Sequence, residues 1–172
     1  AEDSLALAQE DLRERGFGSS DVLCGIAASG RTPYVVGGLD YARSLGAATI
    51  AVACTPDSPI AALADVAITA VTGPEVITGS TRLKAGTAQK IILNMLSTGT
   101  MIRLGKVYGN LMVDVKSSNA KLEERARRIV IEATGKSRAE AEEALAKASG
   151  SAKLAILMLL ANLPAEEAQR QL

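Results

Sequence analysis

The sequence predicts an α/β protein built on a doubly wound parallel sheet and followed by a C-terminal helical unit. In residues 1–71, short apolar runs alternate with segments of helical periodicity, which is the order of strands and crossover helices in a parallel α/β layer. After residue 117, only helical patterns follow one another. We therefore expect two domains, residues 1–116 and 117–172, with a sheet that is incomplete within these residues.

Three short apolar runs, at residues 22–27, 48–53 and 66–71, predict the strands. Nearly continuous apolar runs of this length are typical of strands buried on both faces of a parallel sheet. Helices are predicted around them at residues 1–15, 34–45, 56–64 and about 84–104. In the last of these, apolar residues recur at helical spacing, which predicts a buried helix of about five turns. Because three strands make a thin sheet, further strands are expected to precede residue 1.

The C-terminal third is predicted to be a small unit of three or four helices. A cap-like Ser-Ser-Asn at 117–119 precedes a helix over residues 120–133 that closes at Gly135. Ser137 and Glu140 have the spacing of a capping box, and Pro164 opens a short final helix after an apolar one at 151–162. This pattern indicates packing or oligomer contacts rather than chemistry.

Composition excludes several classes of function. Nineteen basic and nineteen acidic residues cancel and aromatic residues are nearly absent, so we expect no nucleic-acid partner. The apolar runs are too short to span a bilayer, so we expect a soluble protein without a membrane partner. We also expect it to be cytoplasmic. Cys24 and Cys54 lie in apolar runs and are expected to be free thiols. The chain has no histidine, so acid–base chemistry must fall to carboxylates, lysine or tyrosine, and no metal site is expected.

The first predicted strand ends in a polar loop. Ser29, Gly30, Arg31 and Thr32 supply two hydroxyls, a flexible backbone and a guanidinium directly before a helix start at Pro33. A helix N-terminus presents unpaired N–H groups and the positive end of the helix dipole, which suits a phosphate. Alone, the same four residues could be a turn with a cap.

A second polar loop follows the third predicted strand and enters the long helix. It contains Glu75, Ser80, Thr81 and Lys84. Ser80 or Thr81 could simply cap that helix. Ligands of open α/β sheets bind beyond the carboxyl ends of the strands, and both loops fall on that edge. Together they predict a site for a phosphate or a phosphorylated sugar.

Three blocks of sequence resemble a known family: GIAASGRTPYV, GPEVITGSTRLKAGTAQK and MLSTGTMIRLGKVYGNLMVDV. They resemble the N-acetylmuramic acid 6-phosphate etherases, a branch of the sugar isomerase (SIS) superfamily of phosphosugar-binding domains, and the likeness covers essentially the whole chain. It implies an SIS-type, flavodoxin-like sheet. The family would supply further strands, a Gly-Ser-rich phosphate loop and a second catalytic glutamate in a SECPP-like motif before residue 1. The chain thus resembles the C-terminal part of an etherase.

The resemblance also implies a reaction. Etherases of this family convert N-acetylmuramic acid 6-phosphate to N-acetylglucosamine 6-phosphate and D-lactate by elimination and water addition, without a cofactor, during cell-wall recycling. The glutamate of the family's GAED segment falls on Glu2, which the resemblance implies is the base that removes the C2 proton. Glu75 is its rival, because related isomerases use a glutamate in a similar setting. The partner acid has no counterpart here, so the isolated chain is expected to be inactive or nearly so.

Two other functions remain open at this stage. SIS domains also serve as regulatory phosphosugar-binding modules without catalysis, and some are phosphosugar isomerases. A close match through GSTRLKAGTAQK favours the etherase. SIS domains commonly dimerise, and the apolar helix over residues 91–102 would suit a homodimer contact.

Overall fold

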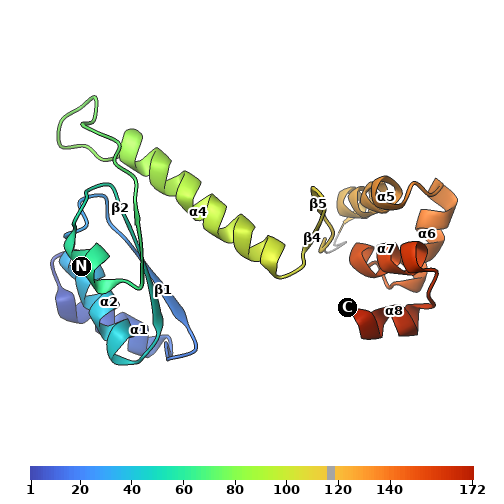
Figure 1. Cartoon of the computed structure of the whole chain (residues 1–172), viewed down its shortest axis with the longest axis horizontal. Helices are drawn as coiled ribbons and strands as arrows, with labels where there is room; N and C mark the ends of the chain where they lie inside the picture. Colours follow the sequence, from blue (N-terminus) through green and yellow to red (C-terminus); the bar gives the residue numbers. More distant parts are fainter. Residues whose placement is uncertain (116–118) are drawn as a thin grey trace. The chain divides into compact units, whose positions relative to one another are not determined.

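A computed structural model describes residues 1–115 and 119–172 of the chain (Figure 1). The described residues divide into two compact units, Ala1–Leu96 and Ser97–Leu172. The predicted boundary between the domains 1–116 and 117–172 falls at residues outside those that are described, as do Ser117 and Ser118 of the predicted cap. It therefore stays a prediction.

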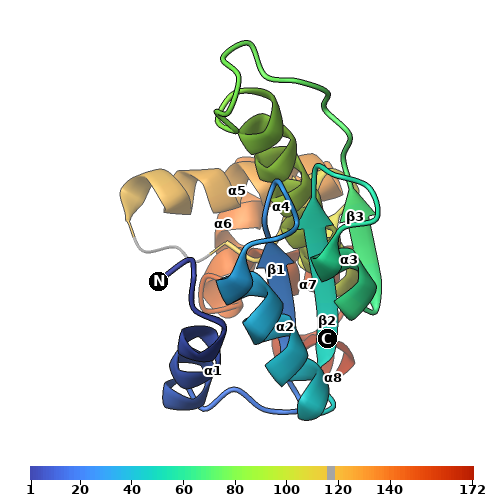
Figure 2. The same cartoon turned by 90° about the vertical axis from the view of Figure 1, so that its left-hand side faces the viewer.

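A three-stranded parallel sheet forms the centre of the first unit. Its strands are β1 (Val22–Ile26), β2 (Ala48–Ala53) and β3 (Val66–Thr69), in the order β1-β2-β3. The helices α2 (Pro33–Ser44) and α3 (Pro59–Leu63) connect them, with α1 (Leu5–Glu14) before β1 (Figure 2). The predicted parallel α/β layer is confirmed. The first helix starts later than predicted, because Ser4 is its N-cap and accepts a hydrogen bond from the Leu7 N–H.

The core of the first unit lies between the sheet and the helices α2 and α3. Leu39 of α2 and Ile60 of α3 are fully buried there and pack with Ala51 and Ala53 of β2. Gly25 of β1 leaves room for Leu39, whose Cδ1 would lie 2.8 Å from a Cβ atom at that position. Small residues in the strands therefore let α2 pack close to the sheet.

A polar contact fixes the amino ends of β2 and β3. The N–H and hydroxyl of buried Thr49 both donate to Asp65 Oδ2, each at 2.8 Å, and the Asp65 N–H donates back to Thr49 Oγ1 at 3.0 Å. These bonds hold the pKa of Asp65 below its ordinary value. This contact at the amino ends helps to fix the register of β2 and β3, and with it the positions of their carboxyl ends.

Helix α4 (Lys84–Arg103) occupies the predicted position, but the prediction that it is buried is wrong. Ile91, Met95 and Ile102 are 52%, 67% and 54% exposed, and Ala85 is its one buried residue in the described part of the chain. The apolar spacing identified a helix face correctly. Burial of that face also depends on what packs against it, which the spacing of apolar residues within one helix does not specify.

Besides the end of α4, the described residues of the second unit form a short hairpin and four helices. The antiparallel strands β4 (Val107–Tyr108) and β5 (Leu111–Met112) were not predicted, because strands of two residues show no period. The helices α5 (Ala120–Thr134), α6 (Arg138–Lys147), α7 (Ala152–Ala161) and α8 (Ala165–Gln171) confirm the predicted helical unit. Asn119 caps α5, and the capping box of Ser137 and Glu140 starts α6 as predicted.

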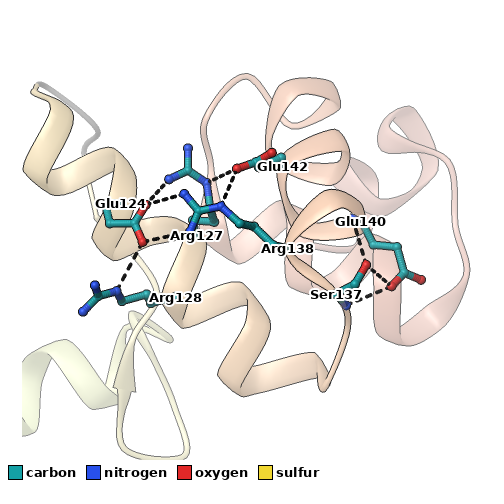
Figure 3. A network of polar contacts seen from close by, with 7 residues as sticks. All are labelled: Glu124, Arg127, Arg128, Ser137, Arg138, Glu140 and Glu142. Carbon is teal, nitrogen blue, oxygen red and sulfur yellow. Dashed lines mark hydrogen bonds and ion pairs between the residues drawn. The ribbon is translucent and has the colours of Figure 1, made fainter.

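A network of charges ties α5 to α6 (Figure 3). The Glu124 carboxylate accepts from Arg138 at 2.9 Å, from Arg128 at 3.3 Å and from Arg127. Arg127 and Arg138 also pair with Glu142, at 2.9 and 3.0 Å. The guanidinium groups, Arg138 foremost, lower the pKa of Glu124 to about 2. This network lies on the surface of the second unit and is structural in kind.

No single described helix is both long and apolar enough to cross a membrane. By length and composition alone, α6 and α7 pass that test only as a pair, and they are bent by 114° at their junction. Half of the residues of α7 are buried in the core of the second unit, which accounts for its apolar sequence.

Candidate functional site

The carboxyl ends of the three strands border a pocket of about 310 Å³, here called the edge pocket. Every residue of its lining belongs to the first unit and comes from the end of β1, the end of β2, the segment after β3, or the first turn of α4. The lining consists of Ala28, Ser29, Cys54, Thr55, Thr72, Gly73, Pro74, Glu75, Thr78, Gly79, Ser80, Thr81 and Ala85. The two predicted loops therefore meet at one site, as the rule for open α/β sheets requires.

Backbone bonds continue past the strands and shape the floor of the edge pocket. The Ala28 carbonyl accepts from the Cys54 N–H at 2.9 Å and from the Thr55 hydroxyl at 3.3 Å. On the other side of β2, the Ala70 N–H donates to the Ala53 carbonyl at 2.9 Å. These bonds hold the segments after β1, β2 and β3 together, so that their side chains converge.

The loop before α2 divides its four predicted residues between different roles. Ser29 lines the edge pocket and is exposed, and its hydroxyl accepts from the Arg31 N–H at 3.3 Å. Arg31 is exposed, and Thr32 stands at the N-cap of α2 with no side-chain cap bond. Neither belongs to the pocket lining. The loop thus offers a hydroxyl at the pocket, with a guanidinium and a second hydroxyl on the adjoining surface.

Gly30 is buried beneath this loop instead of facing a ligand. Its φ of +65° lies in the left-handed region, and a Cβ atom there would overlap the Cβ and Oγ of Ser58. The Gly30 carbonyl also accepts from the Ile60 N–H at 3.2 Å. Gly30 therefore lets the loop pack against the start of α3, and its contribution is to the shape of the loop.

Glu75 occupies the N-terminus of α4. Its carboxylate accepts from the Lys84 N–H at 3.1 and 3.0 Å and from the Ala85 N–H at 3.1 Å, while the Lys84 ammonium donates to the Pro74 carbonyl at 2.9 Å. These two backbone donors, with Lys84 first, lower the pKa of Glu75. The anion position at this helix N-terminus, which the sequence suggested for a phosphate, is therefore filled by the chain's own carboxylate.

The second loop lines the edge pocket through Ser80 and Thr81, with Thr78 beside them. The Thr81 carbonyl accepts from the Gly86 N–H at 3.0 Å, which joins the loop to the first turn of α4. Neither hydroxyl is needed as the cap of α4, because Glu75 bonds the N–H groups there. Their hydroxyls are therefore available to a ligand in the pocket.

Glu2 lies beside the start of α2. The Tyr34 N–H donates to the Glu2 carbonyl at 3.0 Å, although 32 positions separate these residues in sequence. Tyr34 follows Thr32, the last residue of the first loop, by two positions. Glu2 is exposed and is not part of the edge pocket lining. No hydrogen-bond or ion-pair partner holds its carboxylate within the described residues. The chain's first residues are thus tethered next to the Ser29–Thr32 loop with a free carboxylate.

Three polar side chains of the lining were missed from the sequence: Cys54, Thr55 and Thr72. Their signal was their place directly after a predicted strand, the same position that identified the two loops. Burial raises the pKa of Cys54, so its thiol is mostly protonated at neutral pH. No cluster of three or more metal-ligating side chains occurs among residues 1–115 and 119–172.

Comparison with known proteins shows which protein families this chain resembles. The SIS domain family matches residues 8–99, and the C-terminal lid domain of glucokinase regulatory protein matches residues 109–154. N-acetylmuramic acid 6-phosphate etherases of Yersinia pestis (strain Pestoides F) and Yersinia pseudotuberculosis (serotype O:1b) are each 60% identical to this chain over 172 residues. These residues are 100% of this chain and 58% of each relative, so the chain spans less than two thirds of their length.

One solved structure is also similar, a Bacillus subtilis protein provisionally described as a phosphosugar isomerase. The two chains are 21% identical, and the superposition covers 82% of this chain and 38% of the Bacillus subtilis chain, with a TM-score of 0.40.

Proposed function

The chain belongs to the SIS domain family, and from this premise we propose that it takes part in cleaving the lactyl ether of N-acetylmuramic acid 6-phosphate. The products would be N-acetylglucosamine 6-phosphate and D-lactate, as in cell-wall amino sugar recycling. The observation that carries the proposal is the 60% identity to etherases along all 172 residues. We assign the phosphosugar site to the predicted domain of residues 1–116, which contains the edge pocket.

The proposed reaction proceeds through the open-chain sugar. A base takes the C2 proton, whose acidity comes from the adjacent aldehyde, and the electron pair forms the C2–C3 double bond as the C3–O bond breaks. The lactate oxygen leaves with a proton from an acid. Water then adds its hydroxyl at C3 and a proton at C2. Each step needs a positioned carboxylate and donors for the developing negative charge, and none needs a metal or a redox cofactor.

We propose Glu2 as the base in preference to Glu75. The Glu75 carboxylate already accepts from two backbone N–H groups, which lower its pKa and so weaken it as a base. The Glu2 carboxylate has no such donors in the described part of the chain, and its backbone is tethered beside the Ser29–Thr32 loop. Glu75 would instead brace the second loop.

We propose that the sugar phosphate is held where the two loops meet. Ser29, Ser80 and Thr81 line the edge pocket, and Arg31 and Thr32 lie next to it in the first loop. Gly30 and Lys84 would act indirectly, Gly30 through the shape of the loop and Lys84 through its bonds to Pro74 and Glu75. Replacing Arg31 with alanine should raise the Michaelis constant for the phosphorylated sugar, and an unchanged constant would assign the loop a purely structural role.

The decisive experiment measures D-lactate release from N-acetylmuramic acid 6-phosphate by the natural chain that contains residues 1–172. We expect Glu2→Gln to abolish both lactate release and deuterium exchange at C2, with Asp3→Asn, an exposed neighbour, as the matched control. Exchange retained in Glu2→Gln would place the base elsewhere, first at Glu75. If the partner acid lies before residue 1, the 172 residues alone should turn over far more slowly than a chain of the relatives' length.

The alternative is a regulatory phosphosugar-binding module without catalysis. The match of residues 109–154 to the lid domain of glucokinase regulatory protein favours it. Such a module would bind the sugar phosphate in calorimetry without releasing lactate or exchanging the C2 proton. Aldose–ketose interconversion without lactate release would indicate an isomerase.

The proposed function carries two further expectations, a cytoplasmic location and a homodimer. For the homodimer, the exposed Ile91 and Ile102 of α4 would pack against a second copy. Light scattering on the natural chain should give twice the mass of one chain, and a monomeric mass would refute the dimer.

A further inference from the structure

Helix α1 approaches α2 so closely that backbone meets backbone at Gly37. A Cβ atom at Gly37 would overlap the Leu5 carbonyl oxygen and lie 2.8 and 2.9 Å from the Leu5 carbonyl carbon and Cα. These three are backbone atoms, so no rotamer change could move them away. Gly37 lies in the middle of α2, where glycine weakens a helix, and its φ is not in the left-handed region. The contact with Leu5 is therefore the physical reason for a glycine there.

The adjacent Gly38 lacks this constraint. A Cβ atom at Gly38 would lie 3.5 Å from Leu23 Cδ2, 3.6 Å from Ala8 Cβ and 3.8 Å from Leu12 Cδ1. These distances are ordinary van der Waals contacts. Two neighbouring buried glycines of the same helix thus differ in one respect, because only Gly37 admits the backbone of α1.

The close approach at Leu5 controls where Glu2 lies. Leu5 is the first residue of α1, and the Ser4 N–H donates to the Ala1 carbonyl at 3.1 Å, so residues 1–4 form a compact turn. The Tyr34 N–H holds the Glu2 carbonyl at 3.0 Å. Residues 1–5 are therefore fixed against α2 at two backbone points, Leu5 at Gly37 and Glu2 at Tyr34. Figure 2 shows α1 lying beside α2.

The rest of α1 is held to α2 by side chains. The Tyr34 hydroxyl donates to Asp11 Oδ2 at 2.6 Å, and this bond is the main cause that raises the pKa of Tyr34. The Arg13 guanidinium lies 4.9 Å from the centre of the Tyr41 ring. A methyl group at position 37 would have to push α1 outward against these contacts. It would also displace the turn of residues 1–4 that precedes α1 and contains Glu2.

We propose that Gly37 is a positioning residue: it admits the Leu5 carbonyl against α2 and thereby fixes the backbone of Glu2 beside the Ser29–Thr32 loop. The catalytic part of this inference rests on the proposed function, in which Glu2 takes the C2 proton. A misplacement of a catalytic group by about 1 Å can lower turnover about 100-fold. Because Ser29 and the edge pocket lie on other elements, sugar-phosphate binding should be largely preserved.

The test compares Gly37→Ala with Gly38→Ala in the natural chain that contains residues 1–172. Both changes add one methyl group at a buried helix position and both improve helix propensity. We expect Gly37→Ala to lower kcat for D-lactate release about 100-fold while KM changes less than about threefold. Hydrogen exchange of residues 1–14 should accelerate and that of β2 should not. Gly38→Ala should match the wild type in all of these measurements.

Equal kcat values for Gly37→Ala and Gly38→Ala would overturn the proposal, as would a rise in KM at constant kcat. If Gly37→Ala does not fold, Tyr34→Phe serves as the second variant, because it removes only the bond to Asp11. We expect Tyr34→Phe to lower kcat as well, but by less than about 100-fold. Full activity together with unchanged hydrogen exchange of residues 1–14 in Tyr34→Phe would then refute the proposal. A wild-type chain that releases no lactate refutes the proposed function instead. In that case exchange of residues 1–14 in the two glycine variants decides the positioning claim.

Discussion

Replacing Gly30 with alanine should destabilise the first unit by two separable effects. An alanine in the left-handed conformation at φ +65° costs about 1–2 kcal/mol. The added methyl would also overlap Ser58, which is 3% exposed, and such overpacking typically costs about 1–3 kcal/mol. The loop cannot easily shift, because the Gly30 N–H donates to Ala27 and its carbonyl accepts from Ile60. Together the two effects predict a loss of about 2–5 kcal/mol.

Gly73 supplies the control that separates conformational strain from the clash. Its φ is +68°, almost that of Gly30, but no heavy atom lies within 4 Å of a Cβ atom built there. Gly73→Ala should therefore lose only the conformational part, about 1–2 kcal/mol. Adding Ser58→Gly to Gly30→Ala removes the clashing atoms and should recover about 1–3 kcal/mol as a coupling energy.

The assay is hydrogen exchange of the β2 amides, followed by mass spectrometry. The chain divides into two compact units, so a single melting temperature would mix their stabilities, whereas β2 reports on the first unit alone. Equal losses in Gly30→Ala and Gly73→Ala would refute the clash with Ser58. So would a double variant no more stable than Gly30→Ala.

Three further predictions test other parts of the structure. Leu39→Ala, at a fully buried site, should lower the free energy of opening of β2 by about 2–5 kcal/mol, and a loss below about 1 kcal/mol would contradict the described core. Because the folded pKa of Glu124 is lowered to about 2, its contribution to stability is complete above the ordinary glutamate value of 4.5 and is lost as the pH falls toward 2. The urea concentration at which α7 unfolds, read by pulsed hydrogen exchange, should therefore fall between pH 4.5 and pH 2. Arg138→Gln should make this fall smaller. A fall of unchanged size in Arg138→Gln would exclude the Glu124–Arg138 pair as its cause. Finally, iodoacetamide should modify Cys54 more slowly when N-acetylmuramic acid 6-phosphate is bound. Cys24 lies outside the edge pocket and serves as the internal control. Equal protection of both cysteines would argue against binding in that pocket.

Features encoded by neighbouring residues could be predicted from the sequence. The strand after Asp21, the capping box of Ser137 and Glu140, and the left-handed Gly135 that ends α5 each depend on a pattern within a few positions. The hairpin of β4 and β5 escaped prediction because its strands are too short for a period, although Gly109 and Asn110 form the tight connection between them.

The exposed face of α4 shows a different limit. Ile91 and Met95 recur at helical spacing, so the helix and its apolar face were predictable. Whether such a face is buried depends on what packs against it, and that is not a property of the helix sequence. The helical spacing therefore identifies an apolar surface, and the residues or the second chain that cover it must be determined from the structure of the assembled protein.

The roles of the two carboxylates depend on contacts that no local pattern reveals. Glu75 precedes Lys84 by nine positions, well outside the three-residue spacing of a capping box, yet its carboxylate bonds the first N–H groups of α4. The strand-end rule placed both loops on the correct edge, but it could not tell a helix N-terminus open to a substrate from one filled by the chain itself. Glu2 is the opposite case, because its backbone is tethered to Tyr34 and its carboxylate has no partner among residues 1–115 and 119–172. A carboxylate held by backbone donors stabilises structure, and one fixed only through its backbone can still exchange a proton, which supports the proposed assignment of Glu2 as the base and of Glu75 as a brace for the second loop.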